Sequence, residues 1–434
     1  MAARRFDTLV VGGGSAGCVL AARLSEDAGR SVCLVEAGPD YGPFAGGSWP
    51  EDMLDARRLA FSHSWETDVE DRSQLRARIL GGCSAHNACV VIAGTVADYD
   101  EWGPGWTAAE LRPYLERALG ELRVRRFGRD ELSPWHAAFA DAAGADAILH
   151  DVNAVGTVRW NTAFAYLDGA RGRPNLTILA DTLADRIDVR ARCLLTSRGP
   201  LQAETIVLAA GAYGSPGVLL RSGIGPGLAH DLPVGEGLVD HVGVGLAWEP
   251  TAALQEETAR FESRHPLYMA QVTVALEERG LFLFPAVDPG YEISGAVFAM
   301  KPWSRGRVSL LSPDPRQPLR IEHGFLSDER DAAVLARGVD AIRRLVAQEP
   351  LARYAARELR PGEGVDADTH VRAAARGFFH PVGTCAIGRV VDRDGRLVGQ
   401  EGIVVADASV LPTIPRANTN LSTIAVAEKL AETL

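Results

Sequence analysis

The sequence predicts an α/β fold divided into two parts, and three features of its 434 residues support this. Near the start, an apolar run, a glycine-rich turn, an apolar helical stretch and a second apolar run follow one another directly. A further apolar run at Thr205–Gly211 predicts a buried strand. From Val242 to about Ala375 the pattern changes to strands followed by one long helix, which indicates a second part of α+β type, a sheet backed by helices.

The first unit consists of strand, turn, helix, strand and acid. The strands are Thr8–Val11 and Val32–Val35, and Cys18–Leu24 supplies the apolar stretch of the helix. In a Rossmann-like unit that binds a dinucleotide, the first glycine permits the tight turn, the second lets the backbone approach the pyrophosphate, and the third allows the helix to pack on the strand. The residues expected to contact the dinucleotide here are Gly12, Gly14, Ser15, Ala16, Gly17 and Glu36.

Glu36 ends the second strand, where a carboxylate accepts hydrogen bonds from ribose hydroxyls and disfavours a 2′-phosphate. The alternative is a glycine turn that serves packing alone. This unit does not distinguish FAD from NAD.

Composition excludes several classes of partner. The chain has 45 basic and 56 acidic residues, a net charge of −11, and no block of Lys or Arg. We therefore expect neither nucleic acid nor an anionic membrane surface as a partner. No stretch reaches the roughly 20 apolar residues of a membrane-spanning helix, so a cytoplasmic protein is expected. The six cysteines form no C-x-x-C pair, which predicts no metal site and buried free thiols.

A second glycine motif follows at Arg76–Cys89. Gly81 and Gly82 are adjacent and precede small and polar residues, so the backbone could pass close to a flat ring system. The sequence D-Y-D-E-W then begins at Asp98.

These residues resemble the first signature of the glucose-methanol-choline (GMC) family of oxidoreductases, R-x-L-G-G-S-S-x-x-N followed by D-Y-D-x-W. Gly211–Gly225 resembles the second signature of the family, and His380–Cys385 and Asp407–Asn420 resemble its H-P-V-G-T-C and D-A-S to N-x-N endings. The resemblance covers nearly the whole chain in order. It implies a Rossmann-like FAD-binding domain, a discontinuous substrate domain, and FAD in place of NAD.

Within the first signature, G-G-C-S-A-H-N-A-C is similar to the choline oxidase members of the family. There the histidine is bonded covalently to the flavin, and the matching residue is His86. The alternative is a histidine that forms a hydrogen bond in a loop. The further flavin contacts implied by the resemblance are Arg78, Gly82, Cys83, Asn87, Ala88, Ala210, Asp407, Ala408, Thr419 and Asn420. Asp407 could also cap a helix.

The resemblance assigns catalysis to His380 and Asn420. A neutral imidazole is suited to accept the hydroxyl proton of an alcohol because its ordinary pKa lies near 6.5. Asn420 is its expected partner in orienting the hydroxyl, where other relatives have a second histidine. His241 is interpreted as a hydrogen-bonded loop residue rather than a base. Phe378, Phe379 and Trp303 are expected either to line an apolar substrate pocket or to pack in the core.

The expected FAD-binding domain comprises residues 1–114, 154–241 and 376–434, and the expected substrate domain comprises residues 115–153 and 242–375. Helices are expected at Leu111–Leu122, from Pro134 onward, and at Asp328–Gln348 with Ser327 as its N-cap. Typical family members are longer, and the missing length falls mainly in the substrate domain.

The implied reaction is oxidation of a primary or benzylic alcohol to an aldehyde by hydride transfer to flavin N5, with O2 as the electron acceptor. Three alternatives stay open: a dehydrogenase that passes electrons to a quinone or a protein, a flavoprotein lyase or decarboxylase on the same fold, and a cofactor-binding protein without turnover. The sequence also leaves open whether the protein forms a homodimer.

Overall fold

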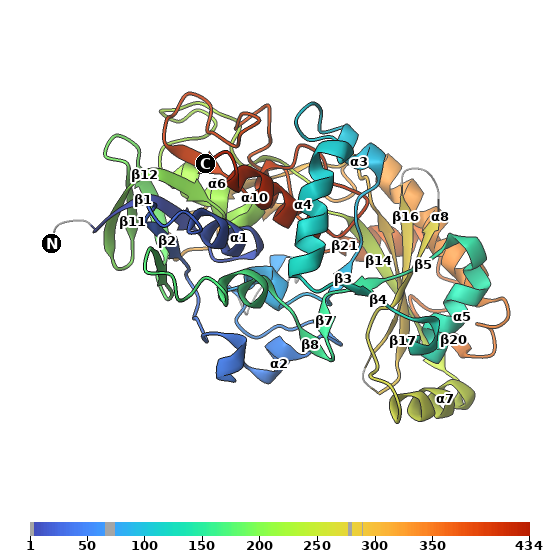
Figure 1. The fold of residues 1–434 in the computed structure, drawn as a ribbon. Helices are drawn as coiled ribbons and strands as arrows, with labels where there is room; N and C mark the ends of the chain where they lie inside the picture. Colours follow the sequence, from blue (N-terminus) through green and yellow to red (C-terminus); the bar gives the residue numbers. More distant parts are fainter. Residues whose placement is uncertain (1–3, 66–73, 277–279, 289) are drawn as a thin grey trace.

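A computed structural model of the protein describes residues 4–65, 74–276, 280–288 and 290–434. Two large sheets lie at opposite ends of the molecule, and helix α4 (Ala108–Glu121) runs between them (Figure 1). The first core is formed around β1 and the second around β14 and β17.

The first sheet has the strand order β10-β11-β12-β1-β2-β9, with β22 paired to β12. Its strands are β1 (Arg4–Val11), β2 (Val32–Val35), β9 (Leu176–Leu179), β10 (Ala184–Asp188), β11 (Cys193–Thr196), β12 (Gly199–Leu208) and β22 (Ile403–Val405). β1 is parallel to both of its neighbours, β12 and β2. Apolar side chains on both faces of these central strands are buried, as expected for parallel strands covered by helices.

Three helices complete this part: α1 (Ser15–Leu24), α6 (Gly211–Arg221) and α10 (Thr419–Ala431). α10, the last helix of the chain, packs against α1 and α4 (Figure 1). The buried carboxylate of Glu428 accepts hydrogen bonds from Arg23 at 2.9 Å and Arg117 at 3.1 Å, which ties the three helices together. Both ends of the sequence therefore contribute to one core.

The second sheet has the order β20-β14-β17-β16-β15-β5, with β21 paired to β14. Its strands are β5 (Ala147–Leu149), β14 (Val242–Pro250), β15 (Val272–Leu276), β16 (Leu281–Val287), β17 (Ile293–Ala299), β20 (Ala355–Arg360) and β21 (Arg376–Gly377). Helices α5 (Pro134–Ala143), α7 (Ala252–Glu262), α8 (Glu329–Val346) and α9 (Ala367–Ala374) accompany it. β5 comes from an early segment, yet it pairs with β15 through Leu149 and Val272.

The remaining elements are short. They are α2 (Glu51–Leu54), α3 (Val96–Asp100), β3 (Val90–Val91), β4 (Arg125–Arg126), β6 (Asp151–Val152), β7 (Ala154–Val155), β8 (Val158–Arg159), β13 (Glu236–Leu238), β18 (Gly306–Leu310) and β19 (Leu319–Glu322), with short 3₁₀ or π turns at 44–46, 82–85, 129–131, 144–146, 163–167 and 408–410. β13, β18 and β19 form a small sheet against α6. Among the described residues, no helix combines the length and hydrophobicity needed to cross a membrane.

The helices expected at Leu111–Leu122, from Pro134 and at Asp328–Gln348 are confirmed as α4, α5 and α8, with small changes of their ends. The prediction that Ser327 is the N-cap of α8 is wrong. Asp328 holds that position, because its carboxylate accepts a hydrogen bond from the amide of Arg330.

The first expected domain boundary, at residue 114, falls inside α4. Leu111 and Ala118, on either side of that position, belong to the same core as β1. We therefore propose to move this boundary beyond Leu122, whose side chain lies in the first core as well.

Candidate active site

The glycine turn after β1 has the geometry that close packing requires. Gly12 has φ +100°, and a Cβ on Gly17 would lie 1.8 Å from the carbonyl oxygen of Gly12. Neither position accepts a side chain without displacing backbone. The start of α1 can therefore lie directly on β1.

The N-terminus of α1 is open to an anion. Gly14 is its N-cap and provides no side-chain cap, and the first turn contains no acidic residue. The first amide N–H groups of a helix, here those from Ser15 to Gly17, have no partners within the helix. They form the kind of donor set that binds a phosphate.

Glu36 lies beside this turn, buried at the end of β2. One carboxylate oxygen accepts a hydrogen bond from the Gly13 amide and the other from the Gly38 amide, both at 2.7 Å. Burial raises the pKa of this carboxyl group, and the two amides oppose that rise. Each oxygen can accept a further hydrogen bond, so the amide contacts are compatible with a ribose hydroxyl.

The second glycine motif meets the first one. A Cβ on Gly82 would lie 2.5 Å from Cα of Gly14. Cys83 is exposed, Asn87 accepts a hydrogen bond from the Cys89 amide at 3.0 Å, and Ala88 is partly buried. Arg78 donates a hydrogen bond to the carbonyl of Ala37, the residue after Glu36, at 3.1 Å.

His86 forms a hydrogen bond in this loop. Its Nε2 lies 2.6 Å from the backbone carbonyl oxygen of Ser62, and since a carbonyl only accepts, Nε2 carries the proton. Burial lowers the pKa of His86 to about 4, so the ring is neutral. This contact corresponds to the hydrogen-bonded alternative, and the covalent bond to flavin stays a prediction.

Asp407 joins the first turn of α6 to the short turn at 408–410. One carboxylate oxygen accepts from the Gly211 amide at 2.8 Å and from Ser215 Oγ at 2.5 Å, and the other accepts from the amide and hydroxyl of Ser409. The side chain therefore caps the short turn that begins at Ala408, which is partly buried. Ala210, immediately before α6, donates its amide hydrogen to Ser215 Oγ at 3.0 Å.

His380 lies in the loop after β21 and is held by its backbone. Its amide donates to Oδ1 of the buried Asp240 at 2.9 Å. Burial raises the pKa of Asp240 to about 6. The preceding residue, Phe379, has φ +63°, so the backbone turns sharply at this point.

Two polar side chains contact the nitrogen atoms of the His380 imidazole. The Nδ1 atom lies 2.9 Å from Nδ1 of His241, and Nε2 lies 3.4 Å from Nδ2 of Asn418. Burial lowers the pKa of His380 well below 6.5, and the neighbouring His241 and Arg76 lower it further. His380 is therefore neutral near pH 7 and can accept a proton.

The partner of His380 differs from the expected one. Asn420 accepts a hydrogen bond from Ser15 Oγ at 2.6 Å and so joins the starts of α10 and α1. Asn418 stands at the N-cap of α10, but its side chain makes no cap hydrogen bond and faces His380 instead. The asparagine side chain beside His380 is therefore that of Asn418 and not that of the expected Asn420, which points toward Ser15. The catalytic role of either asparagine stays a prediction. Thr419, between them, is buried.

His241 forms contacts through both ring nitrogens, as expected for a hydrogen-bonded loop residue. The sequence did not predict that His380, far along the chain, is its neighbour. The second nitrogen of His241, Nε2, lies 2.9 Å from the carbonyl oxygen of Pro415.

An aromatic cluster borders His380. Phe378 lies edge-on to the imidazole, with 4.7 Å between ring centroids, and stacks on Phe298 at 3.8 Å. Phe282, Phe284 and Met300 complete this cluster. Trp303 does not reach it, since it packs on the second core beneath the guanidinium of Arg330.

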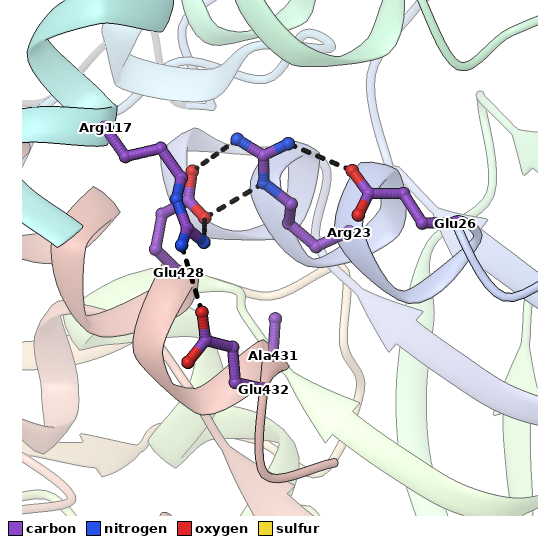
Figure 2. Close-up of a pocket in the computed structure, with 6 residues that line it drawn as sticks. All are labelled: Arg23, Glu26, Arg117, Glu428, Ala431 and Glu432. Atoms are coloured by element: carbon purple, nitrogen blue, oxygen red, sulfur yellow. Dashed lines mark hydrogen bonds and ion pairs between the residues drawn. The ribbon is translucent and has the colours of Figure 1, made fainter. Parts of the chain in front are cut away.

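Two cavities lie away from these residues. One of about 340 Å³ is lined by charged side chains of α1, α4 and α10, including Arg23, Arg117 and Glu428 (Figure 2). The other, of about 230 Å³, lies between Trp248 and Glu358 in the second part. Figure 2 shows that ion pairs join charged side chains that line the first cavity. Neither cavity is lined by a candidate active-site residue.

Comparison with known proteins decides the family. Family models described as GMC oxidoreductase match residues 6–155, 152–243 and 302–427. The chain belongs to the GMC oxidoreductase family. GMC oxidoreductases depend on FAD and act on CH–OH groups.

Similar family members include an oxygen-dependent choline dehydrogenase of Burkholderia ambifaria, 32% identical over 547 positions that cover 100% of this chain and 94% of the relative. That span exceeds the 434 residues present here, so this GMC protein lacks segments that the relative has. The structure of pyridoxine 4-oxidase from Mesorbium loti has a TM-score of 0.85 at 26% identity and covers 99% of both chains. Formate oxidase of Aspergillus oryzae, at 21% identity, TM-score 0.82 and 100% and 98% coverage, shares the fold.

The residues present fit FAD. The uncapped start of α1 offers amide donors for the pyrophosphate, Gly14 leaves that start free of a side chain, and Glu36 provides acceptors for the ribose. Two buried oxygens nearer to His380, Asp240 Oδ2 and Asn418 Oδ1, have no hydrogen-bond partner among the described residues. A bound ligand would supply such partners.

Proposed function

We propose that this GMC oxidoreductase oxidises a primary alcohol to an aldehyde, with His380 as the base and O2 as the electron acceptor. The observation that carries the proposal is the geometry at His380, whose Nε2 faces the amide Nδ2 of Asn418 at 3.4 Å. Burial lowers the pKa of His380, which favours the neutral imidazole. FAD, when bound, supplies the acceptor for the hydride.

His380 and Asn418 divide the work on the hydroxyl group. The contact between Nε2 and Nδ2 is long for a hydrogen bond, so a hydroxyl oxygen can replace it without loss of a strong interaction. The alcohol then donates its proton to Nε2 of His380, and Nδ2 of Asn418 donates to the oxygen. As the proton moves, negative charge grows on that oxygen, and the amide donor stabilises it.

The substrate is proposed to be apolar or aromatic next to its CH2OH group. Phe378, Phe298 and Phe284 form a wall beside the base. Phe378 stacks on Phe298 at 3.8 Å between ring centroids and meets Phe284 edge-on at 5.2 Å. A benzylic alcohol would contact this wall through its ring. Choline is the second candidate, supported by the names of the relatives and by the affinity of aromatic faces for quaternary ammonium groups.

Oxygen as acceptor is supported by the relatives named oxygen-dependent choline dehydrogenase and by the similarity to pyridoxine 4-oxidase. The proposed flavin contacts are the residues around Gly14, Glu36, Gly82 and Asp407 described above, with a covalent bond at His86 as a separate proposal. The proposed FAD-binding domain retains residues 154–241 and 376–434, and its first segment extends beyond Leu122.

Anaerobic mixing of the holoenzyme with benzyl alcohol, pyridoxine and choline tests the proposal. We expect at least one of these alcohols to bleach the flavin absorbance and to yield an aldehyde, and air to restore the colour with formation of hydrogen peroxide. The variant His380→Ala should bind FAD and reduce it about 10² to 10⁴ times more slowly. A flavin that no primary alcohol bleaches would overturn the proposal, and bleaching that air does not reverse would overturn the choice of O2.

A further inference from the structure

The contacts of His241 determine which of its nitrogens carries a proton. The ring is fully buried, and Nε2 lies 2.9 Å from the carbonyl oxygen of Pro415. A carbonyl oxygen only accepts hydrogen bonds, so Nε2 is the N–H donor. A neutral imidazole has one N–H group, which leaves Nδ1 of His241 as an acceptor.

His241 is neutral in this environment. Burial lowers its pKa to about 3, and the positive charge of Lys301 acts in the same direction, while Asp98 opposes it. The lone pair on Nδ1 is therefore present near neutral pH.

The same reasoning extends to His380. Its Nδ1 lies 2.9 Å from Nδ1 of His241, and because that atom is an acceptor, Nδ1 of His380 must be the donor. The second nitrogen, Nε2, is then unprotonated and faces the amide donor Nδ2 of Asn418. All three contacts are satisfied by this one arrangement of protons.

We propose that His241 is a positioning residue: directed by the Pro415 carbonyl, it holds His380 in the tautomer whose Nε2 is free to take the substrate proton. The assignment of that proton to Nε2 rests on the proposed function. When Nε2 becomes protonated, the ring is a cation and its Nδ1–H donates a stronger, charge-assisted hydrogen bond to His241. This contact therefore stabilises the transition state more than the ground state.

Two substitutions separate this role from packing. The amide of His241→Asn begins at the same distance from the backbone as Nδ1, so it can offer an oxygen to His380. The amide of His241→Gln reaches the position of Nε2, so it can keep the Pro415 contact but not the contact with His380. We expect the Gln variant to reduce flavin about 10 to 100 times more slowly than wild type, with little change in KM, and the Asn variant to recover most of that loss.

The tautomer itself is measurable without turnover. Nitrogen-15 spectra of histidine-labelled holoenzyme, with the His380 signals identified by their loss in His380→Ala, should show Nδ1 protonated in wild type and in His241→Asn. His241→Gln should show a mixture of tautomers.

Two results would overturn the proposal: a wild-type His380 protonated on Nε2, or Asn and Gln variants slowed to the same extent. The wild-type spectrum decides the question even where a variant does not fold. Failure of the proposed function gives a different pattern, in which His380→Ala reduces flavin at the wild-type rate while the wild-type spectrum still shows the Nδ1–H tautomer.

Discussion

Gly82 lies directly against Gly14, so close that a Cβ on Gly82 would be 2.5 Å from Cα of Gly14. The contact joins the second glycine motif to the start of α1. Gly82 also has φ +54°, a conformation that favours glycine. Gly14 differs, because its φ of −80° suits any residue and a Cβ there would meet only Cα of Gly82, at 3.8 Å.

We predict that Gly82→Ala lowers the free energy of unfolding by about 2 to 4 kcal/mol, because both its φ and its space are unsuitable for a side chain. Gly14→Ala should leave the unfolding of the cofactor-free protein within about 1 kcal/mol of wild type and lower the FAD content, since its methyl group would cover the start of α1. Urea unfolding and the flavin-to-protein absorbance ratio measure these effects. An equal loss of stability in both variants would contradict the prediction.

The two asparagines of the N-x-N motif should respond differently to substitution. Asn418→Ala removes the donor beside Nε2 of His380, so we expect flavin reduction to slow about 10- to 100-fold with unchanged thermal stability. Rapid mixing with substrate under anaerobic conditions measures the rate.

Asn420→Ala breaks the contact with Ser15 and should cost about 1 kcal/mol of stability. The double variant with Ser15→Ala should lose no more than either single variant, because both remove the same hydrogen bond. Slower flavin reduction in Asn420→Ala than in Asn418→Ala would restore Asn420 as the partner of the base.

The pH dependence of turnover should reflect the neutral form of His380. Burial lowers its pKa well below 6.5. The active, unprotonated base therefore persists as the pH falls through 6.5 and is lost only at lower pH. We expect kcat/KM to stay level from pH 8 to below 6.5 and then to fall. A decline that is half complete at or above pH 6.5 would contradict this.

Acid stability should depend on His150, which is fully buried and whose Nε2 lies 2.7 Å from Thr273 Oγ1. Burial lowers the pKa of His150 to about 3, whereas its pKa in the unfolded chain is about 6.5. Below pH 6.5 the unfolded chain binds a proton that the folded protein does not. Between pH 7.5 and pH 5 this histidine should therefore cost the wild type about 2 kcal/mol of unfolding free energy.

The variant His150→Gln keeps a polar group at this position but cannot titrate. Urea unfolding should give this variant a lower free energy of unfolding than wild type at pH 7.5. At pH 5 the difference between the two proteins should be smaller by about 2 kcal/mol. A difference that does not change with pH would show that His150 does not titrate as described.

The flavin of the purified protein should stay in the protein pellet after acid precipitation if His86 is bonded to it. The variant His86→Asn should then bind FAD before the acid is added and release it into the supernatant after precipitation. A yellow supernatant from wild type would leave His86 with its hydrogen bond to Ser62 as its only role.

The sequence by itself determined the local features of this protein. The glycines at 12, 14 and 17 and the acid at 36 define a dinucleotide unit because each acts within a few residues of its own turn. The buried strands and the amphipathic α8 follow from hydrophobic periodicity, which is also local. Asp328 displaced Ser327 as the N-cap of α8, since neighbouring residues of similar capping ability are not separated by pattern alone.

Only the tertiary structure decided how the base is surrounded. His241 and Asn418 reach His380 from two different loops, and Pro415, in the same loop as Asn418, contacts His241. No local pattern encodes the distances between these residues. The choice of Asn418 over Asn420 depends on the residue at which α10 begins, because that start turns one side chain toward His380 and the other toward Ser15. A sequence lists the groups that can exchange protons, whereas which nitrogen holds each proton depends on contacts that form only when the two sheets and the final helix have packed together.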